Sequence, residues 1–151
     1  MPLIRSRSVV RTAIAGFALV AASSLHGQGG ADSTAATTTR SKVFTAVQAA
    51  KGREVHGAAC LSCHKTVEFA GDKFWGGLVG KTLGEFFGYV RSSMPQDNPG
   101  SLADDDYASV VAFILQLNTM PAGDTPLPAD STALAKIRVV PPDSTRKGPG
   151  Q

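Results

Sequence analysis

The pattern of apolar and polar positions predicts helices through the middle of the chain. Thr45 and Gln48 fit a capping box, which predicts a helix that runs to about Ala59. Thr82 and Glu85 fit a second capping box. Behind this second box, apolar residues recur three and four positions apart, the spacing of one helix face: Leu83, Phe86, Phe87 and Val90.

A third helix is predicted to begin at Ser101, which follows a Pro-Gly turn and can cap the helix. The acidic residues 104–106 would then lie near the positive end of the helix dipole. The apolar stripe of this helix is Tyr107, Val110, Val111, Ile114 and Leu117. No segment alternates at period two for long enough to predict a strand. The sequence therefore predicts an all-α fold with about three main helices.

The compact part of the chain is expected over residues 43–120, and the segments beside it differ in composition. Residues 28–42 are rich in Gly, Ser, Thr and Ala, which predicts a flexible leader. Residues 121–151 contain repeated prolines, which predicts an irregular C-terminal extension. Apolar residues suit this extension to lying across the domain: Leu127, Leu134, Ile137, Val139 and Val140. A domain of this size has a marginal core unless a cofactor adds apolar contact.

Residues 1–27 have the pattern of a secretory signal peptide. Three arginines precede an apolar run, residues 13–22, that is too short to span a bilayer comfortably. Small residues follow, so we expect cleavage between residues 24 and 30. An uncleaved membrane anchor is the alternative. The expected location of the mature chain is the periplasm.

Removal of this segment changes the charge of the protein. The full chain has 15 Lys and Arg residues against 12 Asp and Glu residues, a formal net charge of +3. Arg5, Arg7 and Arg11 leave with the signal peptide, so 12 basic residues remain against the same 12 acidic residues. A mature chain close to neutral gives no support to nucleic-acid binding.

The only two cysteines, Cys60 and Cys63, form a C-x-x-C-H motif with His64. This arrangement is what covalent attachment of a c-type haem needs. The two thiols would add to the haem vinyl groups, and His64 would ligate the iron from the proximal side. The motif therefore predicts one covalent haem c.

Three other interpretations of the motif are weighed against haem attachment. A thioredoxin-like redox pair usually lies where a helix begins, in a βαβ setting, whereas this motif closes a predicted helix. A zinc site needs about four ligands, and the chain has no second cysteine pair. A disulfide between Cys60 and Cys63 would close a very small loop and add little stability.

The sixth iron ligand has three candidates in the mature chain: Met94, Met120 and His56. Met94 follows a predicted helix and leaves enough loop to reach the opposite haem face. Met120 comes after the last helix and is expected to pack on the core, and His56 shares the helix of Cys60. We therefore expect His64 and Met94 as axial ligands. A thioether favours ferrous iron and occupies the position that oxygen or peroxide would need.

Several short motifs together resemble one family. They are Gly52-x-x-x-His56-x-x-x-Cys60, Phe74-Trp75-Gly76-Gly77, Ser93-Met94-Pro95, Pro99-Gly100-Ser101-Leu102 and Tyr107–Leu115. With these motifs, residues 52–118 resemble a class I c-type cytochrome, and more narrowly the single-haem domains found with quinoprotein dehydrogenases. The resemblance implies the class I cytochrome c fold, with its helices wrapped around one haem.

The resemblance also implies particular contacts and shows two departures. The first and last helices should cross closely at Gly52, in contact with an aromatic residue, Phe113. An aromatic is common in the family at the position of His56. The proline whose carbonyl commonly holds the proximal histidine is absent from residues 65–79, so the partner of His64 is unassigned.

Two further sets of residues are candidates for the site. Phe74 and Trp75 are possible haem contacts, and a buried Trp75 could donate its indole N–H to a haem propionate. Exposed lysines in the segment expected to wrap the haem are possible docking residues for an acidic partner: Lys65, Lys73 and Lys81.

Together these features predict a periplasmic monohaem cytochrome that carries single electrons and is not an enzyme. Its expected partners are redox proteins, with a dehydrogenase as donor and an oxidase or another cytochrome as acceptor. Membrane contact is expected only through an uncleaved signal or a complex. The alternatives are a cytochrome subunit of a quinoprotein dehydrogenase or respiratory complex, a haem peroxidase-like enzyme, and a thiol–disulfide oxidoreductase.

Overall fold

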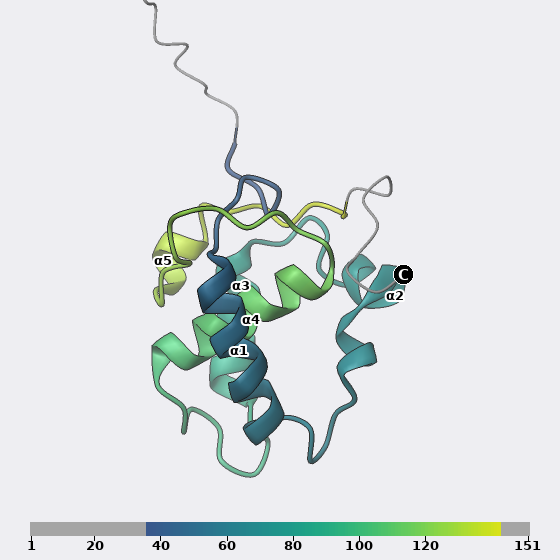
Figure 1. Ribbon diagram of the computed structural model, residues 1–151, viewed down its shortest axis with the longest axis vertical. Helices are drawn as coiled ribbons and strands as arrows, with labels where there is room; N and C mark the ends of the chain where they lie inside the picture. Colours follow the sequence, from purple (N-terminus) through teal and green to yellow (C-terminus); the bar gives the residue numbers. More distant parts are fainter. Residues whose placement is uncertain (1–35, 143–151) are drawn as a thin grey trace, which may run out of the picture. The chain divides into compact units, whose positions relative to one another are not determined.

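The computed structural model describes residues 36–142, and helices are the regular elements of this range (Figure 1). Three of them are long: α1 (Ala46–Ala59), α3 (Leu83–Ser93) and α4 (Asp104–Leu117). The short elements are the 3-10 helix η1 (Thr66–Phe69), α2 (Gly71–Gly76) and α5 (Ser131–Leu134). Residues 36–142 contain isolated β-bridges but no strand. The prediction of an all-α fold with three main helices is confirmed.

The predicted signal peptide, residues 1–27, lies outside the described residues, as do residues 28–35 of the predicted leader and residues 143–151. None of the helices within residues 36–142 combines the length and the apolar character that a bilayer span requires.

The capping box predicted at the start of α3 is complete, whereas the one predicted at the start of α1 forms only in part. At α3, Thr82 Oγ1 accepts from the Glu85 N–H at 3.2 Å, and Glu85 Oε2 accepts from the Thr82 N–H at 2.7 Å. At α1, Thr45 Oγ1 accepts from the Gln48 N–H at 3.1 Å. The Gln48 side chain does not return to Thr45, because it bonds both backbone polar groups of Leu127. The first capping box is therefore half formed.

The start of α4 differs from the prediction. The N-cap is Ala103, which offers no side-chain hydrogen bond, and Ser101 lies in the preceding turn, where its N–H donates to the Asn98 carbonyl. Carboxylates in the first turn favour this helix end electrostatically. Two of them also pair with neighbouring helices, Asp104 with Arg91 of α3 and Asp106 with Lys51 of α1.

The crossing of α1 over α4 is close because Gly52 has no side chain. A Cβ atom added at Gly52 would overlap the backbone carbonyl of Ser109 on α4. The expected close crossing at Gly52 is therefore confirmed, and the atoms nearest to the added Cβ are main-chain atoms of Ser109 and Val110. The Phe113 ring packs against His56, one turn further along α1, with their ring centroids 5.2 Å apart.

The segment before α1 and the segment after α4 both pack against the three long helices. Leu127, Leu134 and Val139 are buried, and the chain after α4 crosses over one end of the helices (Figure 1). Residues 37–42 differ from the predicted flexible leader, because Thr39 is buried and its N–H donates to the Arg138 carbonyl at 3.0 Å. The core thus takes apolar side chains from the extension as well as from the helices.

Candidate functional site

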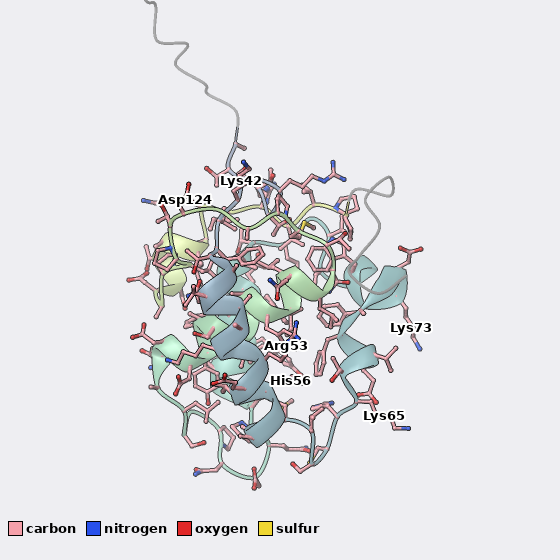
Figure 2. The ribbon with its side chains drawn as sticks, viewed as in Figure 1. Lys42, Arg53, His56, Lys65, Lys73 and Asp124 are labelled. Carbon is pink, nitrogen blue, oxygen red and sulfur yellow. The ribbon has the colours of Figure 1, made fainter. Side chains whose placement is uncertain are left out.

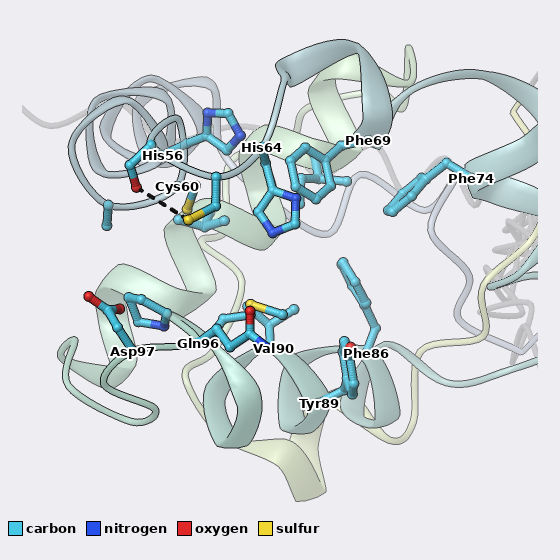
Figure 3. Close-up of a pocket in the computed structure, with 17 residues that line it drawn as sticks. His56, Cys60, His64, Phe69, Phe74, Phe86, Tyr89, Val90, Gln96 and Asp97 are labelled. Atoms are coloured by element: carbon cyan, nitrogen blue, oxygen red, sulfur yellow. Dashed lines mark hydrogen bonds between the residues drawn. The ribbon is translucent and has the colours of Figure 1, made fainter.

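A cavity of about 450 Å³ lies between the end of α1 and the C-terminal part of α3 (Figure 3). Its size is in the usual range for sites that bind small molecules and cofactors. In Figure 3, His56, His64 and Phe69 lie along one wall, and Val90, Gln96 and Tyr89 lie along the opposite wall. Six of the site candidates singled out from the sequence are among the residues that line it: His56, Cys60, Cys63, His64, Phe74 and Met94.

A tight turn at the end of α1 brings the C-x-x-C-H residues to this cavity. Cys60 is the C-cap of α1, and its carbonyl accepts from the N–H groups of Cys63 at 3.2 Å and His64 at 2.9 Å. Both cysteines are free thiols, Cys60 half-buried and Cys63 exposed. The turn therefore presents two thiols and one imidazole to the same space.

This setting disfavours the redox and zinc interpretations. Burial raises the pKa of the Cys60 thiol, whereas a redox-active cysteine needs a lowered pKa, as at a helix N-terminus. Cys60 lies at a helix C-terminus, where the dipole disfavours a thiolate. Residues 36–142 also contain no group of three or more His, Cys, Asp or Glu side chains placed to hold a metal ion.

The His64 ring is held on its Nδ1 side by a residue that the sequence did not single out. Nδ1 lies 3.3 Å from Oε2 of Glu68, four residues later in η1. The Phe69 ring packs edge-on against the imidazole, with centroids 5.2 Å apart. Figure 3 shows His64 projecting into the cavity. A carboxylate at this spacing, in a chain that lacks the usual proline, was the signal that could have identified Glu68.

Met94 is held in place by Tyr107. Met94 is the C-cap of α3, and its N–H donates to the Val90 carbonyl at 2.9 Å. The Tyr107 hydroxyl donates to the Met94 carbonyl at 2.6 Å and accepts from the Leu102 N–H at 3.4 Å. Sequence reasoning treated Tyr107 as a core residue, which its burial supports, but nothing in the pattern indicated this bond.

One family model matches the chain, over residues 47–114, and its description is cytochrome C oxidase, cbb3-type, subunit III. The match covers the C-x-x-C-H turn, α3 and most of α4. Residues 47–114 form a c-type cytochrome domain. No curated protein and no solved structure matches the chain. The narrower resemblance to domains found with quinoprotein dehydrogenases is not confirmed.

The residues of the cytochrome domain fit a haem group. The cavity brings together thiol, imidazole and thioether side chains, which are the donor types that c-type haem uses. Its other walls are largely apolar, with Phe69, Phe86, Val110 and Ile114 among the lining residues. Phe74 packs edge-on against both Phe69 and Phe86, at 5.8 and 6.0 Å between ring centroids. The aromatic side chains thus stiffen one end of the cavity.

Trp75 and Met120 lie away from this cavity. Trp75 is buried, but its indole N–H donates to the Val140 carbonyl at 2.6 Å. The sequence suggested a haem propionate as the acceptor of this indole N–H. The acceptor is instead a backbone carbonyl of the C-terminal segment. Met120 is buried in the core and is not among the lining residues, as expected for a packing residue.

The three lysines considered for docking are all exposed, but they differ in their surroundings. Lys65 and Lys73 point outward on the same side of the domain (Figure 2). Lys81 lines a second cavity of about 320 Å³ that shares Phe74, Phe86 and Tyr89 with the first. None of these lysines forms an ion pair among residues 36–142.

His56 is the buried polar residue of the cavity wall. Its side chain is only 2% exposed, and Nε2 has no hydrogen-bond partner within the described residues. The ring packs against Phe69 and Phe113, with centroids 5.3 and 5.2 Å away. Burial lowers the pKa of His56, and the charge of His64 lowers it further. The folded domain therefore favours neutral His56.

Replacing His56 with phenylalanine is expected to stabilise the protein by about 1–3 kcal/mol, the cost of a buried group without a partner. The gain should grow as the pH falls below about 6.5, because the unfolded wild-type chain then binds a proton that folded His56 resists. Denaturant unfolding of the purified holoprotein at pH 8 and pH 5 measures both effects. An equal gain at the two pH values would exclude His56 titration as the cause.

Proposed function

We propose that this protein is a monohaem c-type cytochrome that transfers single electrons between redox partners. The observation that carries the proposal is the cavity onto which Cys60, Cys63, His64 and Met94 all open, within a c-type cytochrome domain. Proteins of this domain type are typically electron carriers rather than enzymes, and we propose the same for this chain.

Each of these residues would have a separate task. The thiols of Cys60 and Cys63 would form thioether bonds that hold the haem permanently. His64 would bind through Nε2, since its Nδ1 faces Glu68, and Met94 would bind from the loop after α3. The bound haem supplies one-electron iron chemistry. The soft Met94 thioether would favour the ferrous state and close the position that a peroxidase needs for its substrate.

The proposed setting is the periplasm, on the basis of the signal-peptide pattern in residues 1–27. A second candidate function is a cytochrome subunit of a respiratory complex, which the description of the matching family favours. In either role the donor would be a dehydrogenase and the acceptor an oxidase or another cytochrome. Docking of an acidic partner at Lys65, Lys73 and Lys81 stays a prediction.

Haem attachment tests the proposal directly. The full chain, expressed in a bacterium with a working c-type haem maturation system, should be red and should keep its colour after acid–acetone extraction. Mass spectrometry should show the mass of one haem added to the polypeptide. Replacing Cys60 and Cys63 together with alanine should remove the covalent haem, because no other cysteine can form a thioether. A colourless wild-type protein would overturn the proposal.

A further inference from the structure

We propose that Glu68 is a positioning residue for His64, and that its carboxylate strengthens the imidazole as an iron ligand and lowers the reduction potential. Glu68 acts through His64, so this role rests on the proposed ligation of iron by His64. The supporting geometry is the 3.3 Å separation between His64 Nδ1 and Glu68 Oε2.

The local backbone places Glu68 beside the ring. η1 begins directly after Lys65, whose carbonyl accepts from the Glu68 N–H at 2.9 Å. This single turn brings residue 68 back toward residue 64. Phe69 follows in the same turn and packs on the imidazole at 5.2 Å between centroids. The ring is thus held by a carboxylate at Nδ1 and by an aromatic side chain.

The acceptor at Nδ1 decides how the ring binds a metal. A neutral imidazole that binds through Nε2 carries its proton on Nδ1, and the acceptor of that proton fixes the tautomer and raises the basicity of the ligand. A carboxylate forms a stronger hydrogen bond than a neutral carbonyl. With a haem bound, Nδ1 would keep its proton in both oxidation states, so that only one electron would be exchanged with the partner. A more basic ligand stabilises the ferric state, so reduction becomes less favourable.

Exposure limits the size of this effect. The side chains of His64 and Glu68 are 35% and 49% exposed, so water screens part of the carboxylate charge. Residues in this supporting role typically change metal affinity or activity by about 10–100-fold when they are replaced. Because both side chains are exposed, we expect the equilibrium constant for reduction to change only by the lower end of that range, about 10-fold.

The test uses the haem-loaded full chain with Glu68→Ala, Glu68→Gln and the control Asp72→Asn. Asp72 is an exposed carboxylate in the first turn of α2 and is not among the cavity-lining residues. Spectroelectrochemistry should show reduction about 10-fold more favourable in Glu68→Ala, equal to about 59 mV for one electron. Glu68→Gln should shift less in the same direction, because its amide oxygen still accepts the Nδ1 proton. The reduction potential of Asp72→Asn should stay close to that of the wild type.

A second measurement separates positioning from general surface charge. In NMR spectra of the reduced protein, the Nδ1 proton of His64 should exchange with water faster in Glu68→Ala than in wild type or Asp72→Asn. Equal reduction potentials in wild type and both Glu68 variants, with haem content intact, would overturn the role of Glu68 but not the proposed function. So would a shift in Asp72→Asn that matches Glu68→Ala. A wild-type protein without haem would overturn the proposed function and this inference with it.

Discussion

Replacing Met94 with alanine is expected to abolish the weak sulfur-to-iron absorption band at the red end of the ferric spectrum. The same change should lower the reduction potential by on the order of 0.1 V, within the range of about 0.8 V that axial ligands set. The physical reason is that a soft, neutral thioether stabilises ferrous iron, and water or another side chain would replace it. Covalent haem should remain, because Cys60 and Cys63 are unchanged. Absorption spectra and redox titration of the purified holoprotein measure both effects.

Met120→Ala is the matched control for this experiment. Met120 is buried in the core and does not line the cavity, so its truncation should cost about 2–5 kcal/mol of stability without moving the band. If Met120→Ala loses the band while Met94→Ala keeps it, the proposed ligand is wrong. Equal loss in both variants would point to general unfolding, which the circular dichroism of each variant would reveal.

Gly52→Ala is expected to destabilise the protein by about 4 kcal/mol or more, in the range reserved for severe packing defects. The added methyl group would overlap the Ser109 carbonyl, so α1 would have to move away from α4. Backbone cannot rotate aside as a flexible side chain can, which makes this clash costly. Because α1 carries Cys60 at its end, the same movement should reduce the yield of haem-loaded protein.

Gly57→Ala, on the same helix, should have the opposite effect. Gly57 is exposed, and a Cβ atom there would meet nothing within 4 Å. Alanine should therefore stabilise α1 by about 1 kcal/mol through its higher helix propensity. Denaturant unfolding of the two variants beside wild type measures both changes. A Gly52→Ala variant as stable as Gly57→Ala would contradict the close crossing of α1 and α4.

The parts of the fold that depend on local sequence could be predicted. The three long helices follow from apolar spacing and helix start signals, and the Thr82 capping box forms as expected because both of its partners lie within one turn. The Cys60 end of α1 and the position of His64 follow from the C-x-x-C-H motif itself. Met94 was singled out by its place in the chain, and the structure brings it to the same cavity.

The start of α4 at Ala103 rather than Ser101 is a local difference, but the other predictions that failed depend on residues far apart in the sequence. Gln48 leaves its capping box because Leu127, which lies beyond α4, offers both a donor and an acceptor. Trp75 finds its acceptor at Val140 for the same reason. The bond from Tyr107 to Met94 could not be read from a stripe of apolar residues, because a buried tyrosine needs some partner and the pattern does not say which.

Contacts within the protein itself hold both ends of the loop between α3 and α4. The Arg91–Asp104 ion pair joins the two helices, and the Tyr107 hydroxyl holds the Met94 carbonyl. The rate of electron transfer depends on how far the surroundings of the metal must rearrange when its charge changes, and fixed groups have little to rearrange. With Met94 as the proposed iron ligand, we therefore expect its sulfur to keep its place in both oxidation states. Such a centre would exchange electrons rapidly with any partner that comes close enough.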